Sequence, residues 1–244
     1  NEPSFDYKKL GAQMLTKIEG GMGLLMGGTA GVQAAHVVIL GAGTVGLSAA
    51  KVAMGMGARV TILDSNLFRL RQIDDLFGGR IQTLASNAFN IAAATKDADL
   101  LVGSVLIPGA LTPKLVTEAM VKTMKPGSAI VDVSIDQGGC IEPTAKHGAT
   151  YHDKPTFKYP VNGGEVVCYS VGNMPGAVAR TSTFTLTNAT MPYMVDLANK
   201  GWKKACQDDK ALARGINTYD GKVYFKGVSD ALGYELHCTC DILK

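Results

Sequence analysis

Short, apolar, β-branched runs alternate with helical segments along most of this chain, and this alternation limits the possible folds more than any other feature. The runs indicate strands at residues 36–40, 58–64, 80–85, 99–106, 128–135 and 165–171. The segments between them indicate helices at residues 44–57, 67–78, 88–98 and 113–127. Nearly continuous apolar strands separated by helices are typical of a parallel sheet that is covered on both faces. We therefore predict an α/β fold built on a doubly wound parallel sheet.

A glycine-rich loop follows the first of these strands. The sequence VVILGAGTVG places Gly41, Gly43 and Gly46 between a predicted strand and a predicted helix. In a G-x-G-x-x-G loop at this position, the first glycine permits a tight turn, the second lets the main chain approach a pyrophosphate, and the third lets the helix pack closely on the strand. The helix start also offers free N–H groups and a positive dipole end to the phosphates. The loop predicts a Rossmann-type dinucleotide-binding domain.

An acidic residue closes the next predicted strand, ARVTILD. Asp64 lies 23 residues after Gly41, where a dinucleotide-binding domain places the carboxylate that holds the adenosine ribose. Such a carboxylate repels a 2′-phosphate, which favours NAD over NADP, although Arg69 is close enough in sequence to neutralise a phosphate. The alternative is a glycine turn that only packs tightly, with Asp64 capping the next helix. Asn66 is a further candidate for that cap.

Three more loops follow strands and are expected to face the cofactor, because ligands bind at the carboxyl ends of the strands in such sheets. Val105 and Leu106 would lay an apolar surface along the nicotinamide side, as part of the segment VLIP (105–108). Core packing is the alternative for this segment. Asp136 and Asn173 follow the next two predicted strands. For Asn173, formation of a turn is as well supported as contact with a ligand.

Asp136 is the main candidate for a catalytic group. It follows the apolar run AIVDVSI and precedes two glycines that would leave space for a cofactor ring. A carboxylate beside a hydride-transfer site can orient water or an amine and move protons while a carbinolamine forms and collapses. The alternative is a helix or turn cap. His147 and His152 lie nearby in a polar segment, which we interpret as an exposed loop without a catalytic role.

Composition argues against several classes of partner. Hydrophobic residues make up 46% of the 244 residues, and the net charge of +3 comes from 24 basic and 21 acidic residues without a block of like charge. Nucleic acid and anionic membrane surfaces are therefore not expected partners. Residues 20–50 carry no formally charged side chain, but nine of them are glycines. That density favours turns over a membrane-spanning helix.

The cysteines and histidines predict no metal centre. The five cysteines lack C-x-x-C spacing, Cys238 and Cys240 form only a C-x-C pair, and the four histidines are widely separated. We expect neither a disulfide framework nor a zinc site, and we expect a reducing compartment. The chain starts with Asn1 and shows no signal-peptide pattern, which suggests a processed product or part of a longer polypeptide.

Several longer motifs resemble NAD-dependent alanine dehydrogenases, within the alanine dehydrogenase and transhydrogenase α-subunit family. They are GGMGLLMGGTAGV, VVILGAGTVG, VLIPGALTPKLVT, MKPGSAIVDVSIDQGGC and NMPGAVARTSTFTLTNATMPY. The similarity runs from about Leu10 to the C-terminus. It implies reversible oxidative deamination of L-alanine to pyruvate and ammonia with NAD, in a cytoplasmic, hexameric enzyme whose cofactor lies in a cleft between two domains.

The resemblance also implies roles for individual residues. It gives catalytic roles to Asp136 and Asn173 and no role to a metal. It gives cofactor contacts to Gly41, Gly43, Thr44, Val45, Gly46, Asp64, Arg69, Ser86, Val105, Leu106, Ile135, Asp136, Asn173 and Met174.

A change in the sequence pattern suggests how the chain is divided. The strand pattern stops near residue 175, and helices are expected at residues 7–18, 182–201 and 202–215. We expect an N-terminal helix and interdomain connection (1–27), an NAD-binding Rossmann domain (28–175) and a helical part of a second, incomplete domain (176–244).

The chain departs from the family pattern in three places. Thr29 and Ala30 replace valine and proline, and Ala179 replaces a second proline, so the loops lose the restriction that a proline ring imposes. The family's N-terminal segment, which supplies cationic groups for the substrate carboxylate and a catalytic histidine, has no counterpart in residues 1–20. The chain alone is therefore expected to bind the dinucleotide without completing the active site.

Two rival functions remain open from the sequence. The first is the NAD-binding domain of a proton-translocating transhydrogenase, which shares the glycine loop but requires a linked membrane segment and an NADP-binding partner domain. The second is a non-catalytic dinucleotide-binding or oligomerisation module, which the unmatched N-terminal residues would permit.

Overall fold

The computed structural model describes residues 7–107 and 111–244. The described chain forms two compact units. The larger contains residues 7–106 and 111–179, and the smaller contains residues 107 and 180–244. Pro108 of the VLIP segment and the first six residues of the expected N-terminal connection lie outside the described residues.

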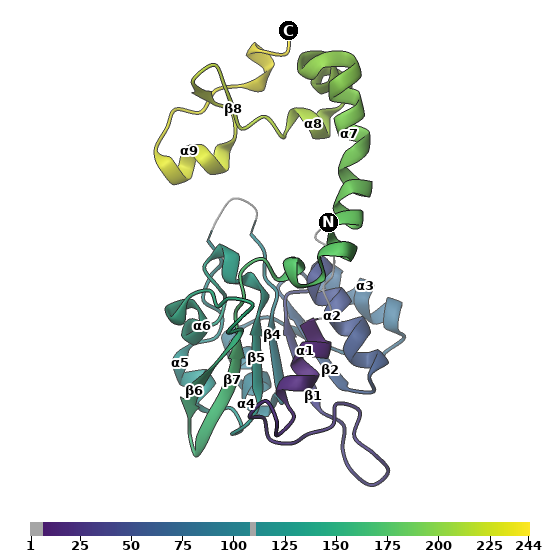
Figure 1. The fold of residues 1–244 in the computed structure, drawn as a ribbon, viewed down its shortest axis with the longest axis vertical. Helices are drawn as coiled ribbons and strands as arrows, with labels where there is room; N and C mark the ends of the chain where they lie inside the picture. Colours follow the sequence, from purple (N-terminus) through teal and green to yellow (C-terminus); the bar gives the residue numbers. More distant parts are fainter. Residues whose placement is uncertain (1–6, 108–110) are drawn as a thin grey trace. The chain divides into compact units, whose positions relative to one another are not determined.

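A seven-stranded sheet forms the centre of the larger unit (Figure 1). Its strand order is β3-β2-β1-β4-β5-β7-β6, and all neighbours are parallel except the edge pair β6 and β7. The strands are β1 (His36–Leu40), β2 (Arg59–Asp64), β3 (Gln82–Ala85), β4 (Leu100–Gly103), β5 (Ala129–Asp132), β6 (Thr156–Val161) and β7 (Gly164–Tyr169). The prediction of a doubly wound, largely parallel sheet is confirmed.

Helices cover both faces of this sheet, and alternate strand residues point into two separate cores. Val37 and Ile39 of β1 share one core with residues of α1 (Tyr7–Met14), α2 (Thr44–Gly55) and α3 (Leu67–Phe77). Val38 and Leu40 share the other core with residues of α4 (Ala88–Asp97) and α5 (Glu118–Lys122), and α6 (Glu142–His147) packs against α5. Burial of each such side chain contributes about 1.5–3 kcal/mol. Because both faces are covered, the strands are apolar on both sides, which is the pattern seen in the sequence.

Side-chain caps fix the starts of α3 and α4. The Asn66 side chain accepts a hydrogen bond from the backbone N–H of Arg69 at 3.1 Å, so the predicted cap of α3 is confirmed. Asn87 caps α4 in the same way through the N–H of Asn90. Gly78 ends α3 in the left-handed conformation, with φ of 57°. These caps satisfy backbone groups that would otherwise have no partner at the helix ends.

Several predicted elements are shorter than expected. The strand expected over 99–106 is confined to β4. The helix expected over 113–127 is confined to α5, which Thr117 caps. The residues before it pair with the loop ahead of α6 instead, since Leu115 N–H donates to Cys140 O at 2.9 Å. The strand expected over 128–135 ends at Asp132, and a 3-10 helix, η1 (Val133–Gln137), follows it. The strand ends there because the Asp132 side chain accepts from Ser134 N–H and starts a turn.

The edge strand β6 was not predicted, and its residues were assigned in part to a polar loop. It forms an antiparallel hairpin with β7. Lys158 and Pro160 of β6 are exposed, so the strand lacks the continuous apolar pattern of the inner strands. A proline is compatible with an edge strand, where one side of the backbone has no partner.

The smaller unit is mainly helical. It contains nearly all of α7 (Ala179–Asp208), together with α8 (Lys210–Ala213), the hairpin of β8 (Thr218–Tyr219) and β9 (Lys222–Val223), α9 (Lys226–Leu232) and the short η3 (Thr239–Asp241). Gly201 breaks α7 with φ of 72° and ψ of 158°, at the predicted boundary between two helices. Among the described helices, none combines the length and the apolar character that crossing a bilayer requires.

One local pairing of cysteines was not predicted. Cys238 and Cys240 form a disulfide, with Cα atoms 5.2 Å apart, within the range that such a bond allows. The C-x-C spacing gave no sign of this pairing because it matches no common framework pattern. Cys140, Cys168 and Cys206 are free and buried.

Candidate functional site

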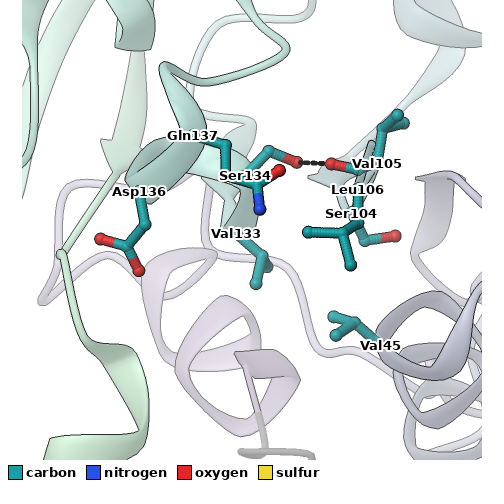
Figure 2. Close-up of a pocket in the computed structure, with 8 residues that line it drawn as sticks. All are labelled: Val45, Ser104, Val105, Leu106, Val133, Ser134, Asp136 and Gln137. Atoms are coloured by element: carbon teal, nitrogen blue, oxygen red, sulfur yellow. Dashed lines mark hydrogen bonds between the residues drawn. The ribbon is translucent and has the colours of Figure 1, made fainter. Parts of the chain in front are cut away.

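The carboxyl ends of β1, β4 and β5 lie next to one another and carry the loops that form the candidate site. Leu40 pairs with Gly103, which in turn pairs with Asp132. A pocket of about 70 Å³, partly open to solvent, lies between the loops that follow these strands. Figure 2 shows the side chains that line it: Val45, Ser104, Val105, Leu106, Val133, Ser134, Asp136 and Gln137. All of them belong to the larger unit.

The three glycines of the loop after β1 occupy three different environments. Gly41 has φ of 95°, and a Cβ there would lie 2.6 Å from the carbonyl oxygen of Ser104. A Cβ on Gly46 would overlap the carbonyl oxygen of Gly41. Beside Gly43, by contrast, no described heavy atom lies within 4 Å of a built Cβ. The first and third glycines are thus required by close packing within the loop, while the second faces open space at the start of α2.

Ser104 joins the loop after β4 to the glycine loop. Its hydroxyl lies within hydrogen-bonding distance of Leu40 O at 2.8 Å and of Gly41 O at 3.1 Å. On the other side, the Ser134 hydroxyl donates to Val105 O at 2.8 Å, the dashed bond in Figure 2. Two serines therefore fix the spacing of the three loops. Sequence reasoning missed both, because each was assigned to a strand.

Asp64 and Arg69 hold Ala42 at the centre of the glycine loop. The backbone N–H of Ala42 donates to Asp64 Oδ2 at 2.7 Å, and Arg69 Nε donates to Ala42 O at 2.8 Å. Asp64 Oδ1 accepts from Asn66 N–H at 2.8 Å, and Ser86 N–H donates to Asp64 O at 2.9 Å. The structure thus brings these predicted residues together at the end of β2. Asp64 does not cap α3, because Asn66 does so. Its carboxylate instead binds Ala42 N–H and orients the glycine loop.

Asp136 and Asn173 also lie together, although 37 residues separate them in the chain. Asp136 Oδ2 accepts a hydrogen bond from the backbone N–H of Asn173 at 3.3 Å. Asn173 has φ of 52° and ψ of 48°, a left-handed conformation that asparagine tolerates better than most residues. Both residues are exposed. Asn173 therefore forms the turn that was one of its two predicted roles, and this turn presents it beside a carboxylate.

Four residues before Asp136 in the sequence, a second carboxylate is fully buried. Asp132 is 0% exposed and accepts from Ser134 N–H, Cys140 N–H and Ile141 N–H. The hydroxyl of Thr144 lies 2.6 Å from Asp132 Oδ2. Burial raises the pKa of Asp132 above its ordinary value, while these hydrogen bonds, beginning with that of Thr144, act in the opposite direction.

Buried thiols near this carboxylate are not suited to nucleophilic chemistry. Burial and the neighbouring Asp132 charge raise the pKa of Cys140 far above its ordinary value, and the same two causes raise the pKa of Cys168 to about 12. Both groups therefore stay protonated at neutral pH, whereas the thiolate is the reactive form. The chemistry of the site falls to carboxylates, hydroxyls and backbone groups.

Gly138 and Gly139, which follow Asp136 in the sequence, serve the loop itself. They have φ of 88° and 74°, and a Cβ on Gly139 would lie 2.8 Å from Asp132 Oδ2. Lys114 Nζ donates to the carbonyl oxygens of both glycines, at 2.6 Å for Gly139. The positive φ angles explain why both residues are glycines, and the close approach of Asp132 is a second reason at Gly139. The role in leaving space for a cofactor ring stays a prediction.

The remaining predicted residues differ in their access to the pocket. Val105 is half-buried and Leu106 exposed, and both line it, as does Val45 at the start of α2. Thr44 is exposed beside Gly43. The side chains of Ile135 and Met174 are 6% and 2% exposed, and neither residue lines the pocket.

The two histidines near the site have no place in the pocket. His147 is exposed and stacks on Phe157 with ring centroids 3.7 Å apart, and His152 is exposed. Neither lines the pocket. Within residues 7–107 and 111–244, no group of three or more His, Cys, Asp or Glu is placed to hold a metal ion.

These features define the class of the protein. A parallel sheet with a reversal of strand order beside β1, a glycine loop leading into α2, and an acidic residue at the end of β2 are the defining parts of a Rossmann-type nucleotide-binding domain.

Comparison with known proteins narrows this class. The family model for the alanine dehydrogenase/PNT C-terminal domain matches residues 8–226, and the chain belongs to that family. The chain is 99% identical over 236 residues to a protein named alanine dehydrogenase from Bilophila wadsworthia (strain 3_1_6), which covers 97% of this chain and 63% of that relative. The chain therefore spans less than two thirds of that relative's length.

One solved structure agrees with this assignment, and a second shares the fold. A structure titled L-alanine dehydrogenase matches with a TM-score of 0.82 and 47% identity, covering 92% of this chain and 60% of its own. A transhydrogenase from Sinorhizobium meliloti matches with a TM-score of 0.60 and 24% identity, over 84% of this chain and 60% of its own. At that identity the second match shows a shared fold only.

The contrast between two glycines can be tested by stability. Gly46→Ala is expected to lower the free energy of unfolding by about 1–3 kcal/mol, because its Cβ would overlap a backbone oxygen that cannot move freely. Gly43→Ala should cost less than about 1 kcal/mol, since space is open there and the residue only loses a favourable N-cap type. Urea unfolding of both variants measures the difference. Equal losses would show that the loop packing is described wrongly.

Proposed function

We propose that this chain acts as part of an NAD-dependent alanine dehydrogenase, which converts L-alanine reversibly to pyruvate and ammonia. The observation that carries the proposal is the 99% identity over 236 residues with the Bilophila wadsworthia protein of that name. The proposal concerns the whole protein, because the chain spans 63% of that relative. Groups that hold the substrate carboxylate are expected from a part of the polypeptide outside these 244 residues.

The site has the features that a dinucleotide needs. The open space beside Gly43 at the start of α2 would admit the pyrophosphate, because no described atom fills it. The ribose hydroxyls of the adenosine would donate to Asp64, whose two oxygens each accept only one backbone N–H and so retain free lone pairs. Val45, Val105 and Leu106 would supply an apolar surface for the nicotinamide side.

The preference for NAD over NADP follows from charge. Asp64 would repel a 2′-phosphate at the position of the ribose. Arg69 offsets this only in part, because its Nε is held on Ala42 O at 2.8 Å and one terminal nitrogen on Gln72 at 3.1 Å. The guanidinium keeps its charge and its other N–H groups, so the preference for NAD rests on Asp64 and Arg69 moderates it.

The chemical step assigned to this chain is proton handling at Asp136. NAD, when bound, accepts the hydride from the substrate carbon. The Asp136 carboxylate would orient a water toward the resulting imine, take a proton as the carbinolamine forms, and return a proton as ammonia leaves. The backbone N–H of Asn173, which donates to Asp136 Oδ2 at 3.3 Å, fixes one carboxylate oxygen and leaves the other available. Asn173 would thus sit beside the reacting carbon.

The proposal is tested by turnover of the full-length protein with alanine and NAD at alkaline pH, followed as NADH absorbance. NAD should be preferred over NADP, and Asp136→Asn should lower kcat by about 10²–10⁴-fold, the usual contribution of a general acid–base group, while NAD affinity stays the same. Asp153→Asn, an exposed carboxylate further along the chain, is the matched control and should change neither quantity.

Two outcomes would contradict the proposal. Reduction of NAD with other amino acids but not with alanine would refute the substrate. A large loss of NAD binding in Asp136→Asn, with turnover limited by that loss, would make Asp136 a cofactor ligand without a role in proton transfer.

We also propose that the protein is a cytoplasmic homo-oligomer, a hexamer by family resemblance. Phe184, Leu186 and Met194 of α7 are 60%, 57% and 60% exposed, and large apolar side chains grouped on one helix are typical of surfaces that another subunit or segment covers. Light scattering of the full-length protein should give six times the mass of one chain. A monomer of full activity would contradict the proposal.

A further inference from the structure

Asp132 is the one fully buried carboxylate among the described residues, and every group that bonds to it donates. It accepts backbone N–H groups from Ser134, Cys140 and Ile141 at 3.1–3.2 Å and lies 2.6 Å from the Thr144 hydroxyl. No ion pair involves it in the described part of the chain. Two acceptor oxygens surrounded only by donors suit an ionised carboxylate.

These donors come from both ends of one loop. We call residues 133–141 the Asp136 loop. Ser134 is its second residue, while Cys140 and Ile141 are its last two. Because one carboxylate binds all three backbone N–H groups, it draws the two ends of the Asp136 loop together. Gly139 completes this closure, since a Cβ there would lie 2.8 Å from Asp132 Oδ2.

On its outer side, the Asp136 loop is held by hydrogen bonds that its carbonyl oxygens accept. Lys114 Nζ donates to Gly138 O and Gly139 O, and Thr112 N–H donates to Gln137 O at 3.0 Å. On the inner side of the Asp136 loop, the negative charge of Asp132 binds backbone N–H groups. On the outer side, the positive charge of Lys114 binds backbone C=O groups. Both kinds of backbone group are thus paired with a charge of opposite sign, which favours one conformation of the loop.

Asp136 lies in the middle of this loop, and among the described residues its side chain bonds to the backbone N–H of Asn173 in the neighbouring turn. Its direction therefore depends on the backbone of η1 more than on side-chain packing, because the residue is exposed. A displacement of about 1 Å in a reacting group can cost on the order of 10²-fold in rate. The groups that hold the backbone of the Asp136 loop in place are therefore expected to affect the rate of turnover.

We propose that Asp132 is a positioning residue, which closes the Asp136 loop from inside and so aims the Asp136 carboxylate at the reacting atoms. The inference rests on the proposed function, since it assigns Asp132 a part in the same reaction. Asp132 itself reaches neither substrate nor cofactor, because it is fully buried. It acts through the backbone of residues 134, 140 and 141.

The main test is Asp132→Asn in the full-length protein. Asparagine has the same shape but turns one acceptor oxygen into an NH2 donor that faces other donors. We expect kcat with alanine to fall by about 10²-fold, as for a misplaced reacting group, while the Kd for NAD stays unchanged. Hydrogen exchange of the amides at residues 134, 140 and 141 should become faster in the same variant.

Two kinds of control separate positioning from general stability. Asp99 is a second buried carboxylate, 7% exposed, that accepts the backbone N–H of His36 at 2.7 Å at the opposite edge of the sheet. Asp99→Asn should reduce stability but leave kcat unchanged. Thr144→Val removes only the hydroxyl that bonds to Asp132 and should lower kcat, whereas Thr144→Ser keeps the hydroxyl and should retain it. These variants also carry the test if Asp132→Asn fails to fold.

Several results would overturn the inference. One is a folded Asp132→Asn or Thr144→Val protein with unchanged kcat and unchanged exchange in the Asp136 loop. Another is an equal loss of kcat in Asp99→Asn, which would indicate a purely structural effect. If the wild-type protein does not oxidise alanine, the proposed function fails, and hydrogen exchange still decides separately whether Asp132 closes the loop.

Discussion

The parallel pairing of β1 with β2 on one side and β4 on the other is the constraint on which the site depends. It brings the carboxyl ends of the central strands to one edge, where their loops must diverge toward opposite faces of the sheet. At this point the glycine loop passes so close to Ser104 that Gly41 cannot carry a side chain. The pocket is the space left by this divergence, and its residues follow the ends of β1, β4 and β5.

Two strand-ending aspartates use the same physical device for different loops. Asp64 ends β2 and binds the backbone N–H of Ala42, while Asp132 ends β5 and binds N–H groups of the loop that follows it. A carboxylate is a strong acceptor for backbone N–H groups, and it holds a loop without filling the space beside it. Asp64 is half-exposed and remains available to a ligand, whereas Asp132 is completely covered. Both carboxylates anchor a loop. Asp64 is exposed enough to bind a ligand as well, whereas Asp132 can only position its loop.

Much of the fold was predictable because it depends on local patterns. The apolar runs gave the inner strands, the glycine loop gave the start of α2, and Asn66 gave the start of α3. Edge strand β6 was missed because Lys158 and Pro160 interrupt its pattern. The helix expected from residue 113 was overestimated because Leu115 and Val116 bond to Cys140, a contact between distant residues that the local sequence does not encode.

The site was predictable to a similar degree. Asp64, Asp136 and Asn173 were singled out because they end or follow strands, and the structure brings Asp136 and Asn173 together, while their roles stay predictions. Ser104 and Ser134 were missed because their hydroxyls act on backbone atoms of other loops. Asp132 was missed although a signal was present: a carboxylate within the run AIVDVSI has to find donors once the strand is buried. The side chains of Ile135 and Met174 proved to be interior, which strand position alone does not reveal.

A crystal structure of the protein with NAD bound would show where the dinucleotide lies. We expect electron density for the pyrophosphate against the backbone of residues 43–46, with the adenosine ribose within hydrogen-bonding distance of Asp64 and the nicotinamide between Val105 and Asp136. Density for the dinucleotide anywhere other than the carboxyl edge between β1 and β4 would contradict this expectation.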